Sequence, residues 1–155
     1  MSLKYMFRSL LVLALIFATC PTPAHAIDLP LTISADQNSG YERALFKHWI
    51  DADKDRCDTR KEVLILEAVK QPSLGSGCSI IGGKWISPYD GRTTSDPTTL
   101  DIDHLVPLSE AWRSGAWKWS AQQRQAFAND LNDDRALVAV TAGLNRSKGD
   151  QDPST

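Results

Sequence analysis

The fold is decided by residues 100–107, which read Leu100-Asp101-Ile102-Asp103-His104-Leu105-Val106-Pro107. Apolar and polar residues alternate along most of this stretch, which is typical of a β-strand with one buried face. Pro107 ends the strand because proline has no N–H group to give to a strand ladder. The sequence therefore predicts a short strand that carries Asp103 and His104 near its carboxyl end.

Two segments further along the chain belong with this strand. The apolar run over Ala136–Thr141 predicts a second strand, and Ala142–Lys148 predicts a short helix directly after it. Antiparallel pairing of the two strands would return the chain to the same end of the sheet. The helix would then aim Asn145 at Asp103, although the two residues are far apart in the sequence.

The rest of the chain is predicted to be helical or irregular. Residues 41–50 carry apolar side chains at helical spacing, and Thr59 with Glu62 resembles a capping box that opens a helix to about Lys70. The remaining predictions are a loop over 72–83, a short strand over 84–89, a loop over 93–99, a helical or irregular segment over 108–119 broken at Gly115, and a helix from Ser120 to about Leu131. The fold class is therefore α+β, with an N-terminal helical pair and a helical insertion between the two core strands.

The N-terminus has the pattern of a secretory signal peptide over residues 1–26. Two basic residues precede an apolar run over residues 10–18, and Ala24-His25-Ala26 is a small-x-small cleavage site. Cleavage after Ala26 leaves 155 − 26 = 129 residues, enough for one core. We expect residues 27–39 to be an extended leader and residues 40–155 to be the folded domain. The mature protein is expected to be secreted or periplasmic and not bound to a membrane.

Charge and cysteine content narrow the class of protein. Removal of the signal peptide leaves 17 − 2 = 15 Lys+Arg against 19 Asp+Glu, which argues against a protein that coats nucleic acid by charge alone. Cys57 and Cys78 remain after Cys20 is removed with the signal peptide. An even pair of cysteines in an exported chain predicts a disulfide, and neither has a partner at the close spacing of zinc motifs.

An acidic loop precedes the second predicted helix. Asp51, Asp53, Asp55 and Glu62 fall at positions one, three, five and twelve, which is the ligand spacing of an EF-hand calcium loop. Against a calcium site, Arg56 stands at position six in place of the turn glycine, and Glu62 is also explained as a capping-box partner. A structural Ca²⁺ site and a solvated acidic turn therefore both stay open.

A series of different short motifs follows in order from Tyr41 to Pro153. They are Tyr41-x-Arg43, Phe46-x-x-Trp49, Asp51-x-Asp53-x-Asp55, Cys57-Asp58-Thr59-Arg60-x-Glu62-Val63-Leu64, Trp85, Tyr89-Asp90-Gly91, Asp101-x-Asp103-His104-x-Val106-Pro107-Leu108, Glu110-Ala111-Trp112, Ser114-Gly115-Ala116, Phe127-Ala128-Asn129-Asp130-Leu131 and Asn145-Arg146-Ser147-Lys148-Gly149-Asp150. This ordered set resembles the HNH (His-Me finger) endonucleases, specifically the secreted relatives of the C-terminal domain of GmrSD-type restriction enzymes. The resemblance implies a ββα-metal core, since strand, long connection, strand and helix follow in that order.

The resemblance implies a one-metal mechanism of phosphodiester hydrolysis. DNA would be the substrate, with RNA as an additional candidate, and the products would carry a 5′-phosphate and a 3′-hydroxyl. Asp103 and Asn145 would hold the metal, and these oxygen ligands favour Mg²⁺ or Mn²⁺. His104, in its neutral form, would be the general base.

The same resemblance implies cations for the phosphate and a partner for the base. Lys148, with Arg146 or Arg60, would neutralise phosphate charge. Many HNH proteins carry an asparagine just before the second core strand, where this chain has acidic residues and an arginine. Asn129 and Asp134 are therefore both candidates for orienting the base.

Two other functions stay open. One is a non-enzymatic exported module that binds calcium or a cell-surface polymer on a decayed HNH core, which the acidic loop and the net acidity favour. In the other, the chain keeps the HNH fold but is a toxin domain that a partner activates. The intact set of Asp103, His104 and Asn145 favours the enzyme.

Overall fold

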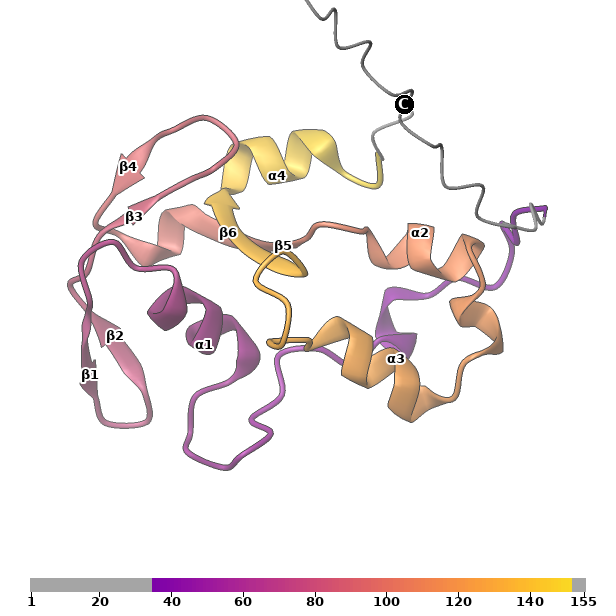
Figure 1. Cartoon of the computed structure of the whole chain (residues 1–155), viewed down its shortest axis with the longest axis horizontal. Coiled ribbons are helices and arrows are strands. Elements are labelled where there is room, and N and C mark those ends of the chain that lie inside the picture. Colours follow the sequence, from indigo (N-terminus) through magenta and orange to yellow (C-terminus); the bar gives the residue numbers. More distant parts are fainter. Residues whose placement is uncertain (1–34, 152–155) are drawn as a thin grey trace, which may run out of the picture. The chain divides into compact units, whose positions relative to one another are not determined.

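The computed structural model describes residues 35–151, so the predicted signal peptide and most of the predicted leader lie outside the described residues. In this part the chain is mixed α+β, with small antiparallel sheets and four α-helices (Figure 1). None of the described helices has the length and apolar character needed to cross a membrane.

A two-stranded ladder lies at the centre of the described part. It pairs β5 (Leu100–His104) antiparallel with β6 (Leu137–Thr141), and His104 lies opposite Leu137. The helix α4 (Ala142–Lys148) follows β6 directly. These three elements confirm the strand, strand and helix that the sequence predicts.

Helices cover the ladder on two sides. In Figure 1, α4 lies above the pair and α1 (Thr59–Leu66) lies below it. Because side chains alternate along a strand, Asp101 and Asp103 lie on the α4 side of β5, where both form ion pairs with α4. Ile102 turns the other way, into an apolar cluster with residues of α1. The strand thereby separates its carboxylates from its apolar face.

The core has two apolar clusters. One joins α1 to the ladder and contains Val63, Leu64, Trp85, Leu100, Ile102, Leu137 and Ala139. The other joins the N-terminal segment to the insertion and contains Phe46, Leu108, Ala111, Trp112, Ala116 and Ala128. The insertion is helical, as predicted: α2 (Leu108–Arg113), the 3-10 turn η3 (Ala116–Lys118) and α3 (Ala121–Ala128). A capping box of Ser120 and Gln123 opens α3, at the residue where the sequence predicts this helix to begin.

The predicted N-terminal helical pair is wrong in its first member. Residues 41–50 form only the 3-10 turn η1 (Arg43–Leu45), and Trp49 has a left-handed φ of 58° that no helix accommodates. The second member, α1, ends at Leu66, earlier than predicted, and its N-cap is Asp58, not Thr59. Thr59 is engaged elsewhere, because its hydroxyl donates to the Ile50 carbonyl and to the Asn129 side chain. Long-range hydrogen bonds have replaced the local helical pattern.

The loop predicted over residues 72–83 is also wrong, because it contains a hairpin. Its strands are β1 (Ser73–Gly75) and β2 (Ser79–Ile81). A second hairpin follows, formed by β3 (Trp85–Ile86) and β4 (Thr93–Thr94), and the 3-10 turn η2 (Pro97–Thr99) leads into β5. The Gly/Ser-rich sequence forms the turn of the first hairpin, where Gly77 has a left-handed φ of 65°.

The predicted disulfide between Cys57 and Cys78 is confirmed. Their Cα atoms lie 5.2 Å apart, and both residues are buried. The bond ties the loop before α1 to the β1–β2 hairpin. Because this half of the molecule has only very short strands, the covalent link fixes a segment that strand pairing alone would hold weakly.

Candidate functional site

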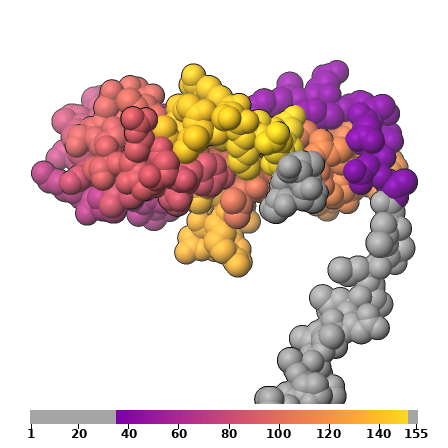
Figure 2. All heavy atoms as spheres, turned by 90° about the horizontal axis from the view of Figure 1, so that it is seen from above, coloured from indigo at the N-terminus to yellow at the C-terminus, as the bar shows by residue number. Residues whose placement is uncertain are grey.

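A cavity of about 260 Å³ brings together Asp103, His104 and Asn145. Strand β5 supplies the aspartate and the histidine, and α4 supplies the asparagine. Pro107 and Leu108, at the start of the insertion, also line it. Figure 2 shows the surface on this side of the molecule, where α4 lies exposed near the N-terminal segment. The three residues that the sequence predicts to act together therefore share one cavity.

Two side chains hold the carboxylate of Asp103 from one side. The Tyr89 hydroxyl donates to Oδ2 at 2.5 Å, and Nζ of Lys148 lies 3.1 Å from the same oxygen and 3.5 Å from Oδ1. Neither Tyr89 nor Lys148 lines the cavity. Burial and the neighbouring carboxylate raise the pKa of Tyr89 well above its usual range, so the phenol stays a donor. Because Tyr89 contacts only Oδ2 and Lys148 also lies closer to Oδ2, Oδ1 is the Asp103 oxygen with the weaker hydrogen bonding.

Asp101 lies two residues before Asp103 on the same face of β5, and it anchors α4. Its Oδ2 accepts from the Asn145 side-chain amide at 3.4 Å and from Nε of Arg146 at 3.2 Å. With its nitrogen directed at Asp101, the Asn145 amide has an oxygen without a hydrogen-bond partner among residues 35–151. The amide oxygen and the Asp103 carboxylate are both hard donors, a pair that suits Mg²⁺ or Mn²⁺.

His104 is enclosed on several sides and is 5% exposed. Its ring stacks on Trp49 with 5.7 Å between centroids and lies edge-on to His48 at 6.2 Å. Nε2 lies 3.0 Å from the Ala128 carbonyl oxygen. Because a carbonyl only accepts, Nε2 must carry the hydrogen, and Nδ1 is left with the free lone pair.

The same surroundings keep His104 uncharged. Burial lowers the pKa of its imidazole to about 4, and the charges of Arg43 and His48 act in the same direction. The Ala128 carbonyl offsets part of this effect, as does the charge of Asp103. At neutral pH the ring is therefore a neutral base with one defined acceptor nitrogen.

The two residues predicted as candidates for orienting the base lie elsewhere. The Asn129 side chain accepts from Ile50 N–H and the Thr59 hydroxyl, and it donates to the carbonyls of Lys47 and Gln125. It thus clamps the segment that carries Trp49, and it directly follows Ala128, whose carbonyl contacts His104. Asp134 lines a different hollow, and no hydrogen bond within residues 35–151 joins it to His104.

The cations predicted for the phosphate are each engaged by the protein itself. Lys148 lies on Asp103, Arg146 lies on Asp101, and the Arg60 guanidinium donates to the Leu100 carbonyl at 2.8 Å. Leu100 begins β5, so Arg60 is at the far end of the strand from His104. Of these three cations, Arg146 alone lines the cavity.

The sequence did not reveal the residues that shape the site from other segments. Tyr89 and Trp49 each belong to a motif that carries the family resemblance, but neither motif gave them a role. The Ala128 carbonyl is a backbone group, and no residue type signals it. Only the spatial position of the three distinguishes them.

The acidic loop has a compact geometry. Carboxylate oxygens of Asp51, Asp53 and Asp55 all lie within 4.8 Å of one another. Each of these side chains also accepts a backbone N–H of the loop, at distances of 2.7–3.3 Å. Burial, reinforced by the nearby aspartates, raises the pKa of Glu62. Both predictions for this loop, a calcium site and a solvated turn, remain consistent with the geometry.

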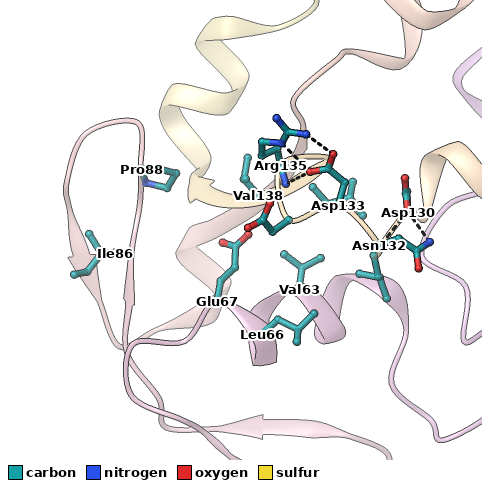
Figure 3. A pocket seen from close by; sticks show the side chains of 13 residues that line it. Val63, Leu66, Glu67, Ile86, Pro88, Asp130, Asn132, Asp133, Arg135 and Val138 are labelled. Atoms are coloured by element: carbon teal, nitrogen blue, oxygen red, sulfur yellow. Dashed lines mark hydrogen bonds and ion pairs between the residues drawn. The ribbon is translucent and has the colours of Figure 1, made fainter.

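A hollow of about 1000 Å³ lies between α1, the β3–β4 hairpin and the segment over residues 130–138 (Figure 3). Its acidic side chains are Glu67, Asp130, Asp133 and Asp134, and its arginine, Arg135, is bound to Asp133 at 2.7 Å. This negative lining repels phosphate groups. The smaller cavity at His104 is therefore the candidate site.

The chain is similar to a known protein family and to a secreted protein. The family described as "GmrSD restriction endonucleases, C-terminal domain" matches residues 70–155, a range that includes Asp103, His104 and Asn145. An uncharacterized secreted protein of Arthroderma benhamiae is 41% identical over 165 residues, which cover 99% of this chain and 79% of that protein. No solved structure matches.

Proposed function

The chain belongs to the family of the C-terminal domain of GmrSD restriction endonucleases, and from this premise we propose that it is a metal-dependent HNH endonuclease that hydrolyses phosphodiester bonds of DNA. The observation that carries the proposal is the shared cavity of Asp103, His104 and Asn145, on elements that follow one another as strand, strand and helix. We propose that these elements are a ββα-metal core. The predicted signal peptide and the secreted relative support an exported enzyme.

We propose that Asp103 and Asn145 hold Mg²⁺ or Mn²⁺. The fit rests on the donor set, since the less engaged carboxylate oxygen and the unpartnered amide oxygen are both hard ligands. When bound, such an ion supplies positive charge to the phosphate and its leaving oxygen. Tyr89 and Lys148 would keep the Asp103 carboxylate oriented from behind.

His104 would act through Nδ1. A water molecule gives its proton to this nitrogen while its oxygen forms the new bond to phosphorus. The bond from phosphorus to the 3′-oxygen breaks, and this oxygen takes a proton from solvent water to become the hydroxyl. The Ala128 carbonyl fixes the tautomer that this step requires, and Trp49 holds the plane of the ring. The products would carry a 5′-phosphate and a 3′-hydroxyl.

Plasmid nicking tests this proposal. Cleavage is expected with Mg²⁺ and not with EDTA, and His104→Ala should lower the rate by about 10²–10⁴. Lys70→Ala is the control, because Lys70 is exposed and does not line the cavity. Near wild-type turnover of His104→Ala, in protein that keeps its circular dichroism spectrum, would contradict the assignment. Labelled RNA in the same assay compares the second substrate.

The competing proposal is a non-enzymatic exported module. It rests on the close approach of Asp51, Asp53 and Asp55, which offers a place for Ca²⁺. Calorimetric Ca²⁺ binding that Asp53→Asn removes, together with no cleavage by the wild-type protein, would favour the module. Cleavage that depends on His104 would favour the enzyme.

A further inference from the structure

Arg43 is a cation of the catalytic cavity that has no acidic partner. It lines the cavity together with Asp103 and His104, and no ion pair within residues 35–151 includes it. Arg146, the other arginine of the cavity, is bound to Asp101. The carboxylate of Asp150 lines the same cavity but is not paired with Arg43 either. Arg43 therefore has no ion pair of its own among residues 35–151, and its side chain is hydrogen-bonded to the uncharged Tyr41.

Hydrogen bonds and a buried side chain hold the backbone around Arg43 in place. Arg43 begins the turn η1, and its carbonyl accepts from Phe46 N–H at 3.1 Å. Phe46 is fully buried in the cluster formed with the insertion, and Arg124 donates to the Leu45 carbonyl at 3.3 Å. Arg43 thus belongs to an anchored turn. Its charge reaches the base, since it lowers the pKa of His104.

A phosphodiester that reacts with water at His104 must place its non-bridging oxygens in this cavity. Those oxygens need a cation, and a guanidinium can bind two of them at once. Lys148 is paired with Asp103 and Arg60 donates to the Leu100 carbonyl, and neither Lys148 nor Arg60 itself lines the cavity. We propose that Arg43 binds the scissile phosphodiester and stabilises the charge that develops there in the transition state. This inference rests on the proposed nuclease function.

DNA binding in EDTA tests the contact without cleavage. The probe is a short fluorescein-labelled DNA duplex, and its affinity is measured by anisotropy over a range of salt concentrations. Arg43→Gln should reduce the slope of log K against log[salt] by about one, the loss of one phosphate contact. Arg43→Lys keeps the charge and should keep the slope. Arg56→Gln is the control, because Arg56 is exposed in the acidic loop and this substitution removes the same charge as Arg43→Gln.

Cleavage kinetics give the second readout. At saturating Mg²⁺, Arg43→Gln should lower kcat/KM by about 10²-fold, as expected when one charge-stabilising donor is lost. Arg43→Lys should recover part of this loss, and Arg56→Gln should stay near wild type. Melting curves identify any variant that has not folded, and Arg43→Met, which also removes the charge, then replaces Arg43→Gln as the variant that decides.

The two proposals fail in different ways. If Arg43→Gln has the same salt slope and the same kcat/KM as the wild-type protein, the proposed role of Arg43 is overturned. The nuclease proposal still stands in that case, provided that the wild-type protein cleaves DNA. A reduced slope in Arg43→Gln, with no cleavage by the wild-type protein, would support the phosphate contact and overturn the nuclease. An equal loss of slope in Arg56→Gln would show a general effect of charge and overturn the inference.

Discussion

Replacement of His104 by glutamine should remove an acid-sensitive part of the protein's stability. The folded protein lowers the pKa of His104 from 6.5 to about 4, mainly by burial. Between these values the unfolded chain binds a proton that the folded chain does not, so the free energy of unfolding falls as the pH falls from about 6.5 to about 4. A pKa lowered by this amount corresponds to ~3 kcal/mol. The contribution is fully present above pH 6.5 and absent below pH 4.

Urea unfolding measures this effect. Wild type and His104→Gln are compared at intervals between pH 4 and pH 8, and the difference in the free energy of unfolding is plotted against pH. The glutamine amide can still donate to the Ala128 carbonyl, so the main neutral contact is kept. Glu62 and Glu67, whose pKa values burial raises, titrate in both proteins and cancel in the difference.

The expected difference changes by ~3 kcal/mol in favour of the variant as the pH is lowered, and most of the change falls between pH 6.5 and pH 4. Two parallel curves would refute the reasoning, since they would mean that His104 titrates alike in the folded and unfolded chains. Such a result would also remove the argument that the base is neutral because it is buried.

Three other predictions follow from the contacts. Tyr89→Phe removes the donor to Asp103, so the Mg²⁺ concentration for half-maximal cleavage should rise several-fold with little change in melting temperature; an unchanged Mg²⁺ titration would contradict the proposed role. Asn129→Ala breaks four hydrogen bonds and should lower the free energy of unfolding by about 1–3 kcal/mol, which chemical denaturation measures; a change below 0.5 kcal/mol would refute the clamp. Conversion of Cys57 and Cys78 to serine should cost about 3 kcal/mol on the chain-entropy model, and equal midpoints of unfolding would argue against that model.

The sequence predicted the central unit because its signals are local. Alternation marks β5, an apolar run marks β6, and the Ser120 capping box marks α3. Antiparallel pairing of two such strands with a helix after the second leaves few arrangements, so the approach of Asp103 and Asn145 to one cavity could be predicted.

The sequence could not predict the segments that distant contacts control. Residues 41–50 have helical spacing, yet hydrogen bonds from Asn129 hold Lys47 and Ile50 in an extended path, and Trp49 takes a left-handed conformation. The His104 ring is oriented by a carbonyl of α3, a group that every residue type carries. The neutral form of His104, the hydrogen bonds of Asp103 and the lack of an ion pair at Arg43 among residues 35–151 all depend on side chains brought together from separate segments.

The pairing of Asp103 with Val138 has a consequence for the order in which the protein is made. Synthesis proceeds from the N-terminus, so Asp103 and His104 leave the ribosome well before β6 and α4 exist. Closure of β5 on β6 must wait for the whole helical insertion, and long-range pairing of this kind forms slowly. The nascent chain therefore carries the predicted base and one predicted ligand without the residue that completes the set. If the polypeptide is exported before it folds, it lacks the completed cavity while it is inside the producing cell. The cavity would then form only after the chain has crossed the membrane.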